Sequence, residues 1–391
     1  MSIKDISRLF GPAWIVMIAN IDTASVIAAV SNGQIYGYGL VWFLVLLTVP
    51  LFIIQEACGR IGAVTGLGLG ELIRSRFSGY VAILTMAPIF IADMASYIVE
   101  YIGIVLGGLL IGIPPYISLP SFFLIHIMLV IKGKYQSFEK FLILISFILF
   151  LAFLIQLIIR GIDPTQSIFY FSTDPNFLFF LATNVGAVIM PFMPIYQASA
   201  TAYKYSRLDY EVKDKVKWVS IETIIGSIVS ELIMIFIEMS TTGLGIKDPL
   251  NYHNISESLS IVGNFSPLVF GIGLIFSGLL SLIVISLGSS WGILEALRKN
   301  NDIKSFLAIY SIESLPAIII IALMNYQNIV YTILEILSIY PIIVSIPAIL
   351  IGYLVSDRKV MGEFAYKGPR KILYWLMTSL VLISGIISLI Y

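Results

Sequence analysis

The chain has 391 residues, of which 59% are hydrophobic and 12% are charged, and its mean hydropathy is +0.98. Soluble domains carry about 25% charged and about 45–50% apolar residues, so this composition excludes a soluble enzyme. Lys and Arg number 23, as do Asp and Glu, so no net positive charge indicates a nucleic-acid partner. With one cysteine, Cys58, and two histidines, neither an intramolecular disulfide nor a Cys/His metal cluster is expected.

Apolar runs of about 20 residues, long enough to cross a bilayer, recur along the whole sequence. They predict an all-α polytopic protein of the cell membrane, a single membrane domain over residues 1–391. The eleven predicted transmembrane helices lie near 11–31, 39–57, 80–112, 117–131, 138–159, 177–202, 218–243, 265–296, 305–324, 328–355 and 372–390. Lys and Arg concentrate in inside loops. With the N-terminus inside, all 23 except Arg160 and Lys247 fall there, which supports this topology.

Two spans are interrupted by residues that disfavour a continuous helix. The first span contains Asp22, followed by small and hydroxyl-bearing residues up to Ser25, which offer the backbone competing hydrogen bonds. The sixth contains Pro191 and Pro194, and a proline removes a backbone donor. Matching interruptions in two five-span halves predict a transporter whose binding site lies at the membrane midplane, where unwound backbone carbonyls hold a cation.

Acidic residues lie inside or at the ends of many spans, whereas no Lys or Arg lies at mid-span. The acids are Asp22, Glu56, Asp93, Glu100, Glu222, Glu231, Glu238, Glu295, Glu313 and Glu335. An ionised side chain at bilayer depth costs at least ~2.5–3.5 kcal/mol, so such a residue usually faces a polar cavity or a partner. The excess of negative charge favours a cation as substrate.

These acids differ in their expected roles. Asp22 lies in the first interruption and is predicted to bind the cation. Three acids near the inside ends of spans are expected to be solvated: Glu56, Glu222 and Glu295. Three deeper acids are expected to face a polar interior: Glu231, Glu313 and Glu335. Asp93 and Glu100 share one helical stripe, which is either a hydrogen-bonded seam or a proton path; with Glu335 they form the candidate proton path.

Met190 lies directly before Pro191 in the second interruption. A methionine in an apolar span usually fills a gap in the packing. A thioether beside a carboxylate, however, shifts the preference of a site from Mg²⁺ or Ca²⁺ toward transition metals. Met190 is therefore a candidate soft ligand, and Met193 is a second candidate.

Further motifs extend over nearly the whole chain: residues 60–66 after the second span, 277–279 in the eighth, and 356–364 after the tenth. Together with the interrupted spans, they resemble the NRAMP (natural resistance-associated macrophage protein) divalent-metal transporters. The resemblance implies a LeuT-like fold with two inverted five-helix repeats, about 11–160 and about 177–355. One extra helix follows, at about 372–390.

The family motif Asp-Pro-Gly-Asn reads Asp22-Thr23-Ala24-Ser25 here, and the family motif Met-Pro-His reads Met190-Pro191-Phe192. The resemblance therefore implies a metal site formed by five residues: the side chains of Asp22, Ser25 and Met190, and the backbone carbonyls of Ala19 and Ala187. Phe192 replaces a histidine that the family associates with proton movement, so proton coupling stays open.

The third-span acids of the family are matched in part. Glu100 fits the family's Glu, while the Asp position falls near Ser96 or Tyr97, one turn from Asp93. The family's Gln in span 10 has no clean match, although Glu335 and Tyr340 lie nearby.

The implied function is secondary-active transport of Mn²⁺ or Fe²⁺ across the bilayer by alternating access, with the divalent cation as substrate and no resident cofactor. Two transport alternatives remain open: an NRAMP-related Mg²⁺ transporter, and an amino-acid or organic-cation carrier of the same fold. The second would use aromatic walls such as Tyr97, Phe192 and Tyr196. A channel or a metal sensor is a third class. An enzyme is not expected, because the sequence offers no nucleophile–base pair.

Overall fold

The computed structural model describes residues 11–131, 135–207, 209–246, 250–299, 302–324 and 329–390, with side chains omitted at 131, 135–147 and 252–253. Residues 1–10 and Lys247, which contribute to the predicted orientation, lie outside this part. Every regular element within it is a helix. The first half contains α2 (Pro12–Ala19), α3 (Thr23–Tyr36), α4 (Val41–Thr65), α5 (Leu69–Arg76), α6 (Gly79–Leu110), α7 (Pro115–Ile131) and α8 (Tyr135–Arg160). The second contains α9 (Pro175–Val188), α10 (Phe192–Ser206), α11 (Val212–Thr241), α12 (Tyr252–Ile255), η1 (Ser256–Phe265), α13 (Ser266–Leu297), α14 (Ile303–Leu323), α15 (Ile329–Ser356), α16 (Arg358–Met361), η3 (Gly362–Phe364) and α17 (Gly368–Ile390).

Eight helical stretches of the described residues are long and apolar enough to cross a membrane: α4, α6, α9 with α10, α11, η1 with α13, α14, α15 and α17. The bent pair α2 and α3 makes a ninth. The helix α7 and the last part of α8 are apolar but shorter, and they coincide with the spans predicted at 117–131 and 138–159. The multi-pass character is thus confirmed, while the count of eleven spans, the inside N-terminus and the division into two repeats stay predictions.

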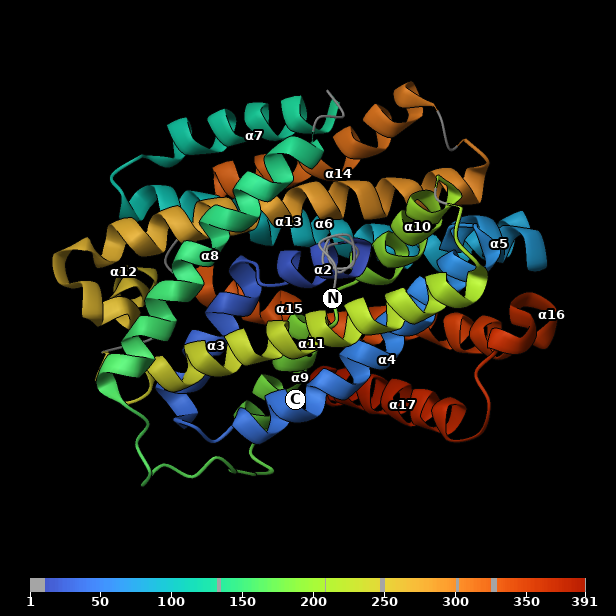
Figure 1. The fold of residues 1–391 in the computed structure, drawn as a ribbon. Helices are drawn as coiled ribbons and strands as arrows, with labels where there is room; N and C mark the ends of the chain where they lie inside the picture. Colours follow the sequence, from blue (N-terminus) through green and yellow to red (C-terminus); the bar gives the residue numbers. More distant parts are fainter. Residues whose placement is uncertain are drawn as a thin grey trace.

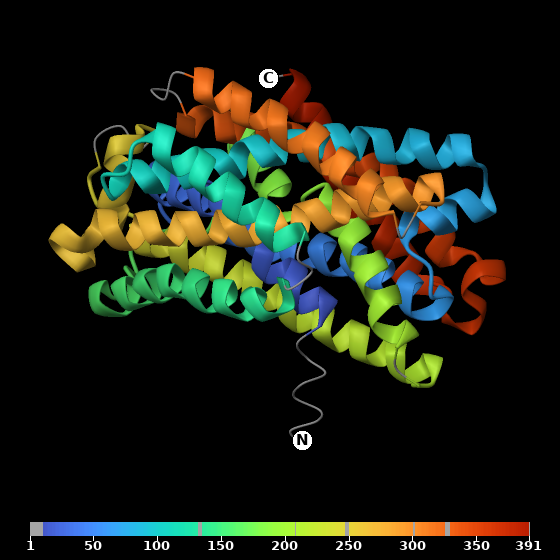
Figure 2. The same ribbon diagram turned by 90° about the horizontal axis from the view of Figure 1, so that it is seen from above.

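The broken helices lie at the centre of the molecule. Figures 1 and 2 show α2 and α3 in the interior, with α11 along one side of them and α13 along the other. The long helices α6 and α13 pack closely against each other, and α10 packs against α4 and α13. This arrangement surrounds the two interruptions with α4, α6, α11, α13 and α15.

Local sequence signals set many helix boundaries. Ser78 begins α6, because its hydroxyl accepts a hydrogen bond from the Val81 N–H (3.2 Å). Asp174 caps α9 in the same way, through the Asn176 N–H (2.9 Å). At the other end of a span, Gly66 ends α4 with a φ of +66°, a left-handed conformation that glycine adopts without strain.

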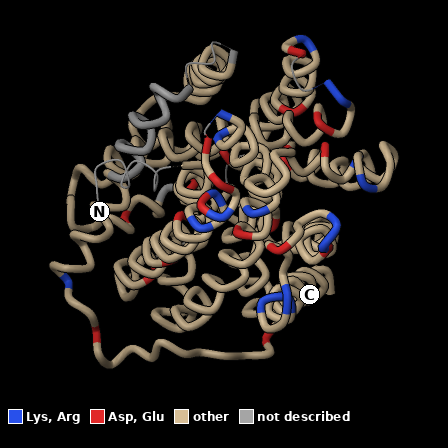
Figure 3. The backbone as a smooth tube through the Cα atoms, turned by 45° about the vertical axis from the view of Figure 1, so that its right-hand side comes forward, with Lys and Arg blue, Asp and Glu red and all other residues tan. Residues whose placement is uncertain are grey.

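The surface fits a lipid environment in its middle and water at its ends. Outer helices expose large apolar side chains, such as Ile312 and Ile319 on α14. Lys and Arg lie at helix ends and in connections, as Figure 3 shows. The Arg76 guanidinium donates to the Lys359 carbonyl (2.8 Å), so two connections predicted to lie inside do meet at one end.

At this end of the molecule, Glu56 is the centre of a buried polar cluster. Its Oε1 pairs with Nη2 of Arg60 (2.6 Å) and Nη2 of Arg370 (3.0 Å), and its carboxylate accepts hydrogen bonds from the Ser220 and Tyr366 hydroxyls. Burial and the charge of Glu56 raise the pKa of the Tyr366 hydroxyl well above its usual value, so Tyr366 stays a donor. These five residues, the Glu56 cluster, join α4 to α11 and α17.

The expectation that Glu56, Glu222 and Glu295 are solvated is wrong, because each is at most 7% exposed. Glu222 accepts a hydrogen bond from the Trp14 N–H (3.0 Å) and pairs with Lys204 (3.4 Å). Glu295 accepts a backbone N–H of α5 (3.0 Å). The partners come from other helices, which a position near the end of a span does not reveal.

Candidate metal site

The first interruption is real and has an identifiable cause. The axes of α2 and α3 differ by 53° across residues 20–22. Asp22 caps α3, since its Oδ1 accepts a hydrogen bond from the Ser25 N–H (2.9 Å). In a continuous helix the Thr23 N–H donates to the Ala19 carbonyl; here it donates to Oε2 of Glu100 on α6 (3.4 Å). Side chains thus replace backbone bonds at this point.

The second interruption arises from proline. The helix α9 ends at Val188, and Ile189 leaves the helical region with φ −125° and ψ 86°. Pro191 has no N–H to continue the ladder, and α10 starts directly after it. Met190, between them, is 1% exposed, and its N–H donates to the sulfur of Met193 (3.3 Å).

The two interruptions meet in the interior of the molecule. The Ser25 hydroxyl donates to the Asn20 carbonyl (2.7 Å) and lies 3.0 Å from the carbonyl oxygen of Ala187. The amide of Asn20 donates to the carbonyl of Val188 (3.3 Å). Residues more than 150 positions apart therefore face each other, and the predicted ligands Ser25 and Ala187 are brought together.

Asp22 has an unusual environment for a buried acid. It is 0% exposed, and besides its capping bond it accepts one from the Ser281 hydroxyl of α13 at Oδ2 (3.5 Å). The carboxyl group of Glu100 lies directly beside it. No Lys or Arg within the described ranges forms an ion pair with it. Asp22 is thus held in place by neutral donors, with a second acid as its neighbour.

Glycines allow the surrounding helices to approach the interruptions. A Cβ on Gly103 of α6 would overlap the side chain of Thr23. A Cβ on Gly278 of α13 would lie 3.1 Å from the carbonyl oxygen of Glu100 and 3.2 Å from the Thr23 hydroxyl. Near the second interruption, a Cβ on Gly186 would overlap the backbone of α15.

The remaining predicted residues fall in different places. Ala19 is buried at the end of α2, and Asp93 and Glu100 are buried on α6. Glu335 is exposed on α15, so the expectation that it faces a polar interior is wrong, and the structure does not bring it to the other two acids. Instead Tyr340, which lies on another face of α15, forms a hydrogen bond with the Ser96 hydroxyl (2.7 Å between oxygens).

Sequence reasoning missed two residues of this site, Asn20 and Ser281. Asn20 is itself part of the polar run around Asp22, and Ser281 follows Ser277 at helical spacing on the eighth span. These signals point to a polar helix face, but they do not show what that face touches.

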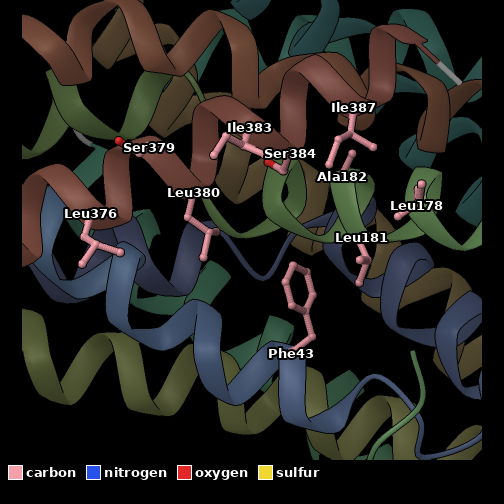
Figure 4. A pocket seen from close by; sticks show the side chains of 10 residues that line it. All are labelled: Phe43, Leu178, Leu181, Ala182, Leu376, Ser379, Leu380, Ile383, Ser384 and Ile387. Carbon is pink, nitrogen blue, oxygen red and sulfur yellow. The ribbon is translucent and has the colours of Figure 1, made fainter. Parts of the chain in front are cut away.

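No group of three or more His, Cys, Asp and Glu residues in the described part of the chain is arranged to hold a metal ion. The set at the interruptions differs from such a group, because it combines one carboxylate with a hydroxyl, carbonyls and a thioether. A separate cavity of about 320 Å³ between α4, α9 and α17 offers no charged side chain (Figure 4). Phe43, Leu181 and Leu380 line it, so it is unsuited to a cation.

Residues 13–391 match the sequence profile of the natural resistance-associated macrophage protein-like (Nramp) family. The chain belongs to the Nramp family. It is therefore a multi-pass membrane transporter and not an enzyme, as the composition and motifs predicted.

The chain is also similar to individual transporters, in sequence and in structure. The chain is 23% identical over 402 residues to the divalent metal cation transporter MntH of Mesorhizobium japonicum, covering 96% of this chain and 87% of that one. The manganese transporter of Eremococcus coleocola has a similar structure, with a TM-score of 0.82 at 17% identity over 97% of this chain and 85% of that one. MhsT in complex with L-phenylalanine is similar at a TM-score of 0.60 and 14% identity, over 97% of each chain. The predicted LeuT-like fold is confirmed.

Proposed function

We propose that this Nramp protein transports divalent transition-metal ions, Mn²⁺ or Fe²⁺, by alternating access. The observation that carries the proposal is a buried carboxylate, placed where two interrupted helices meet, that has no Lys or Arg partner in the described part of the chain. An isolated carboxylate in such surroundings is strongly disfavoured unless a cation neutralises it. The names of the relatives, a divalent metal cation transporter and a manganese transporter, agree with this cargo.

In the proposed site, Asp22 supplies the negative charge and Ser25 a hydroxyl oxygen. The carbonyls of Ala19 and Ala187 supply neutral oxygens from the two interruptions, and Met190 supplies the soft sulfur. Carboxylates, carbonyls and water suit Mg²⁺ and Mn²⁺ alike, whereas a thioether selects softer ions. The methionine thus favours Mn²⁺ and Fe²⁺ over Mg²⁺.

Alternating access follows from the same interruptions. We propose that the repeats at about 11–160 and about 177–355 rock against each other about this site, with the extra helix outside them. The 53° bend, and the Thr23 N–H that bonds Glu100 and not the backbone of α2, allow α2 and α3 to move separately. Glu100, directly beside Asp22, and Asp93 on the same stripe are the proposed proton path, since Phe192 cannot carry a proton.

The amino-acid carrier is less well supported than the metal carrier. The ring of Tyr196 stacks on Trp291 (5.7 Å between centroids), and the Tyr97 hydroxyl donates to Ser286 (2.7 Å). Phe192 is 0% exposed. These aromatic side chains are committed to the core and do not form the walls of an open pocket.

Uptake by purified protein in liposomes tests the proposal. We expect Mn²⁺ and Fe²⁺ to enter, and Mg²⁺, Ca²⁺ and amino acids added in excess to compete poorly. The Asp22→Ala variant abolishes uptake, and the Glu363→Gln variant, an exposed acid in a connection, is the matched control. Equal uptake by Asp22→Ala and the control contradicts the proposed site, and strong competition by Mg²⁺ selects the Mg²⁺ alternative.

A further inference from the structure

Basic and aromatic side chains form one exposed surface where two connections meet at an end of the molecule. The guanidinium of Arg76, at the end of α5, donates to the Lys359 carbonyl of α16 (2.8 Å), and Figure 1 shows both short helices at that end. The ring of Phe77, the next residue, contacts that of Tyr353 on α15 (5.9 Å between centroids). These four residues and Arg358 are called the α5–α16 patch.

The apolar half of the patch lies at the level where two spans enter the membrane. Phe77 is 41% exposed and lies two residues before α6 begins, and Tyr353 is 57% exposed in the last turn of α15. Both α6 and α15 are long and apolar enough to cross a membrane. Aromatic side chains concentrate at this depth, where the headgroups of lipids meet their acyl chains. The two rings therefore face lipid.

The basic half of the patch keeps its charge. The side chains of Arg76, Arg358 and Lys359 are exposed, and no acid among the described residues forms an ion pair with them. The two connections, residues 66–78 and 357–371, contain seven Lys and Arg against three Asp and Glu, so their net charge is positive. One of the three acids, Asp357, is occupied as the cap of α16, where it accepts the N–H of Lys359 (2.8 Å).

The two halves together define the chemistry of the ligand. Guanidinium groups suit the oxygens of a phosphate, and an anionic lipid surface attracts nearby Lys and Arg residues. A soluble anion would use the cations and leave the rings exposed. A zwitterionic lipid carries a cation of its own, which weakens its attraction to the basic half. Only a molecule with a negatively charged head and an apolar body uses both halves.

We propose that the α5–α16 patch binds an anionic phospholipid of the surrounding bilayer. Arg76, Arg358 and Lys359 contact the phosphate, and the rings of Phe77 and Tyr353 lie against the first part of the acyl chains. This inference goes beyond the proposed function and does not depend on which cation the protein carries. A lipid bound in this way stabilises the junction of α5 with α16, which the Arg76 hydrogen bond already joins.

Native mass spectrometry of the full chain in detergent, with equal amounts of phosphatidylglycerol and phosphatidylcholine added, tests the basic half. We expect wild type to retain phosphatidylglycerol in preference. In the double variant Arg358→Gln with Lys359→Gln, this preference falls by about fivefold or more, because about fivefold corresponds to the attraction of one basic residue by an anionic surface. The matched control, Lys213→Gln with Lys217→Gln, removes two exposed lysines from the start of α11 and keeps the preference.

The apolar half is tested on α15. In Tyr353→Ser, we expect less phosphatidylglycerol to be retained than in wild type. The control is Tyr331→Ser, which removes an exposed tyrosine near the start of the same helix that also contacts one phenylalanine ring (5.9 Å between centroids). Equal retention by the two variants contradicts the contact between the patch and the acyl chains.

Three results of these experiments overturn the proposal. If inorganic phosphate displaces phosphatidylglycerol from wild type, the patch is a site for a soluble anion. If wild type retains phosphatidylcholine equally well, the patch does not recognise the charge of the headgroup. If the lysine control on α11 lowers the preference as much as the patch variant does, the effect belongs to the general charge of the protein.

A measurement on the wild-type protein covers the case in which a variant does not fold. In lipid nanodiscs, we expect the unfolding midpoint to be higher with phosphatidylglycerol than with phosphatidylcholine. The difference decreases at high salt, because salt screens exposed charges. Equal midpoints in the two lipids at low salt, or a difference that salt does not change, overturn the proposal.

Discussion

Asp22 and Glu56 are both fully buried acids of membrane-spanning segments, yet their surroundings are opposite. Glu56 is neutralised by Arg60 and Arg370 and receives two hydroxyl donors. Asp22 receives a backbone N–H and a serine hydroxyl, and its titratable neighbour is another acid, Glu100. The comparison teaches that burial alone does not make a cation site. A buried acid is free to bind a cation only where the protein supplies none of its own.

The largest expected effect is on transport when Asp22 is removed. In Asp22→Ala, Mn²⁺ affinity falls about 100-fold or more, because even the outer partners of metal ligands are worth about 10–100-fold. Thermal stability falls only by about 0.5–2 kcal/mol, the cost of losing the cap of α3, since no Lys or Arg among the described residues pairs with this acid. Calorimetry measures the affinity and an unfolding scan in detergent measures the stability. If Asp22→Ala unfolds at a much lower temperature but still binds Mn²⁺ with wild-type affinity, Asp22 is a structural residue and not a metal ligand.

The opposite pattern is expected for the Glu56 cluster. In Glu56→Gln, Arg60 and Arg370 lose their partner, and breaking a buried pair costs about 3–5 kcal/mol of unfolding free energy. The unfolding midpoint therefore drops, whereas the Mn²⁺ affinity of the folded protein stays close to wild type. The exposed acid Glu363, changed to Gln, serves as control. An unfolding midpoint equal to that of the control shows that the cluster is not structural.

A change in the packing around the first interruption is expected to lower stability and uptake by less than the two changes above. In Gly103→Ala, the new methyl group overlaps the Thr23 side chain, and overpacking of this kind costs about 1–3 kcal/mol. Both stability and uptake decrease, because Thr23 begins α3 beside Asp22. The control on the same helix is Gly79→Ala, whose neighbour is the flexible end of Arg74. If both variants behave alike, the close approach of α6 to the interruption is not needed.

The smallest effect concerns selectivity. In Met190→Ala, the preference for Mn²⁺ over Mg²⁺ falls by about tenfold, which corresponds to about 1.4 kcal/mol. Competition uptake measures this ratio. Met86→Ala, a buried methionine of α6 outside the site, shows what a cavity alone does. An unchanged ratio in Met190→Ala means that the sulfur is no ligand and that Asp22 acts with oxygens only.

The sequence predicted the positions of the interruptions well, because their causes are local. Pro191 cannot donate a backbone hydrogen bond wherever it lies, and Asp22 caps the segment that directly follows it. The sequence also predicted that acids outnumber basic residues at mid-span. It was wrong about Glu56, Glu222 and Glu295, for which closeness to a span end was taken as exposure to water.

By itself, then, the sequence determined that this chain crosses a membrane many times, where two of its spans break, and which acid lies in a break. Hydropathy, proline and helix capping depend on neighbouring residues, so their effects can be predicted from the sequence alone. Only the tertiary structure decided which acids are neutralised, that Glu335 faces outward, and that the Glu100 carboxyl group lies beside Asp22. Those facts depend on contacts between helices far apart in the sequence, and no local pattern encodes which side chain a buried carboxyl group will face.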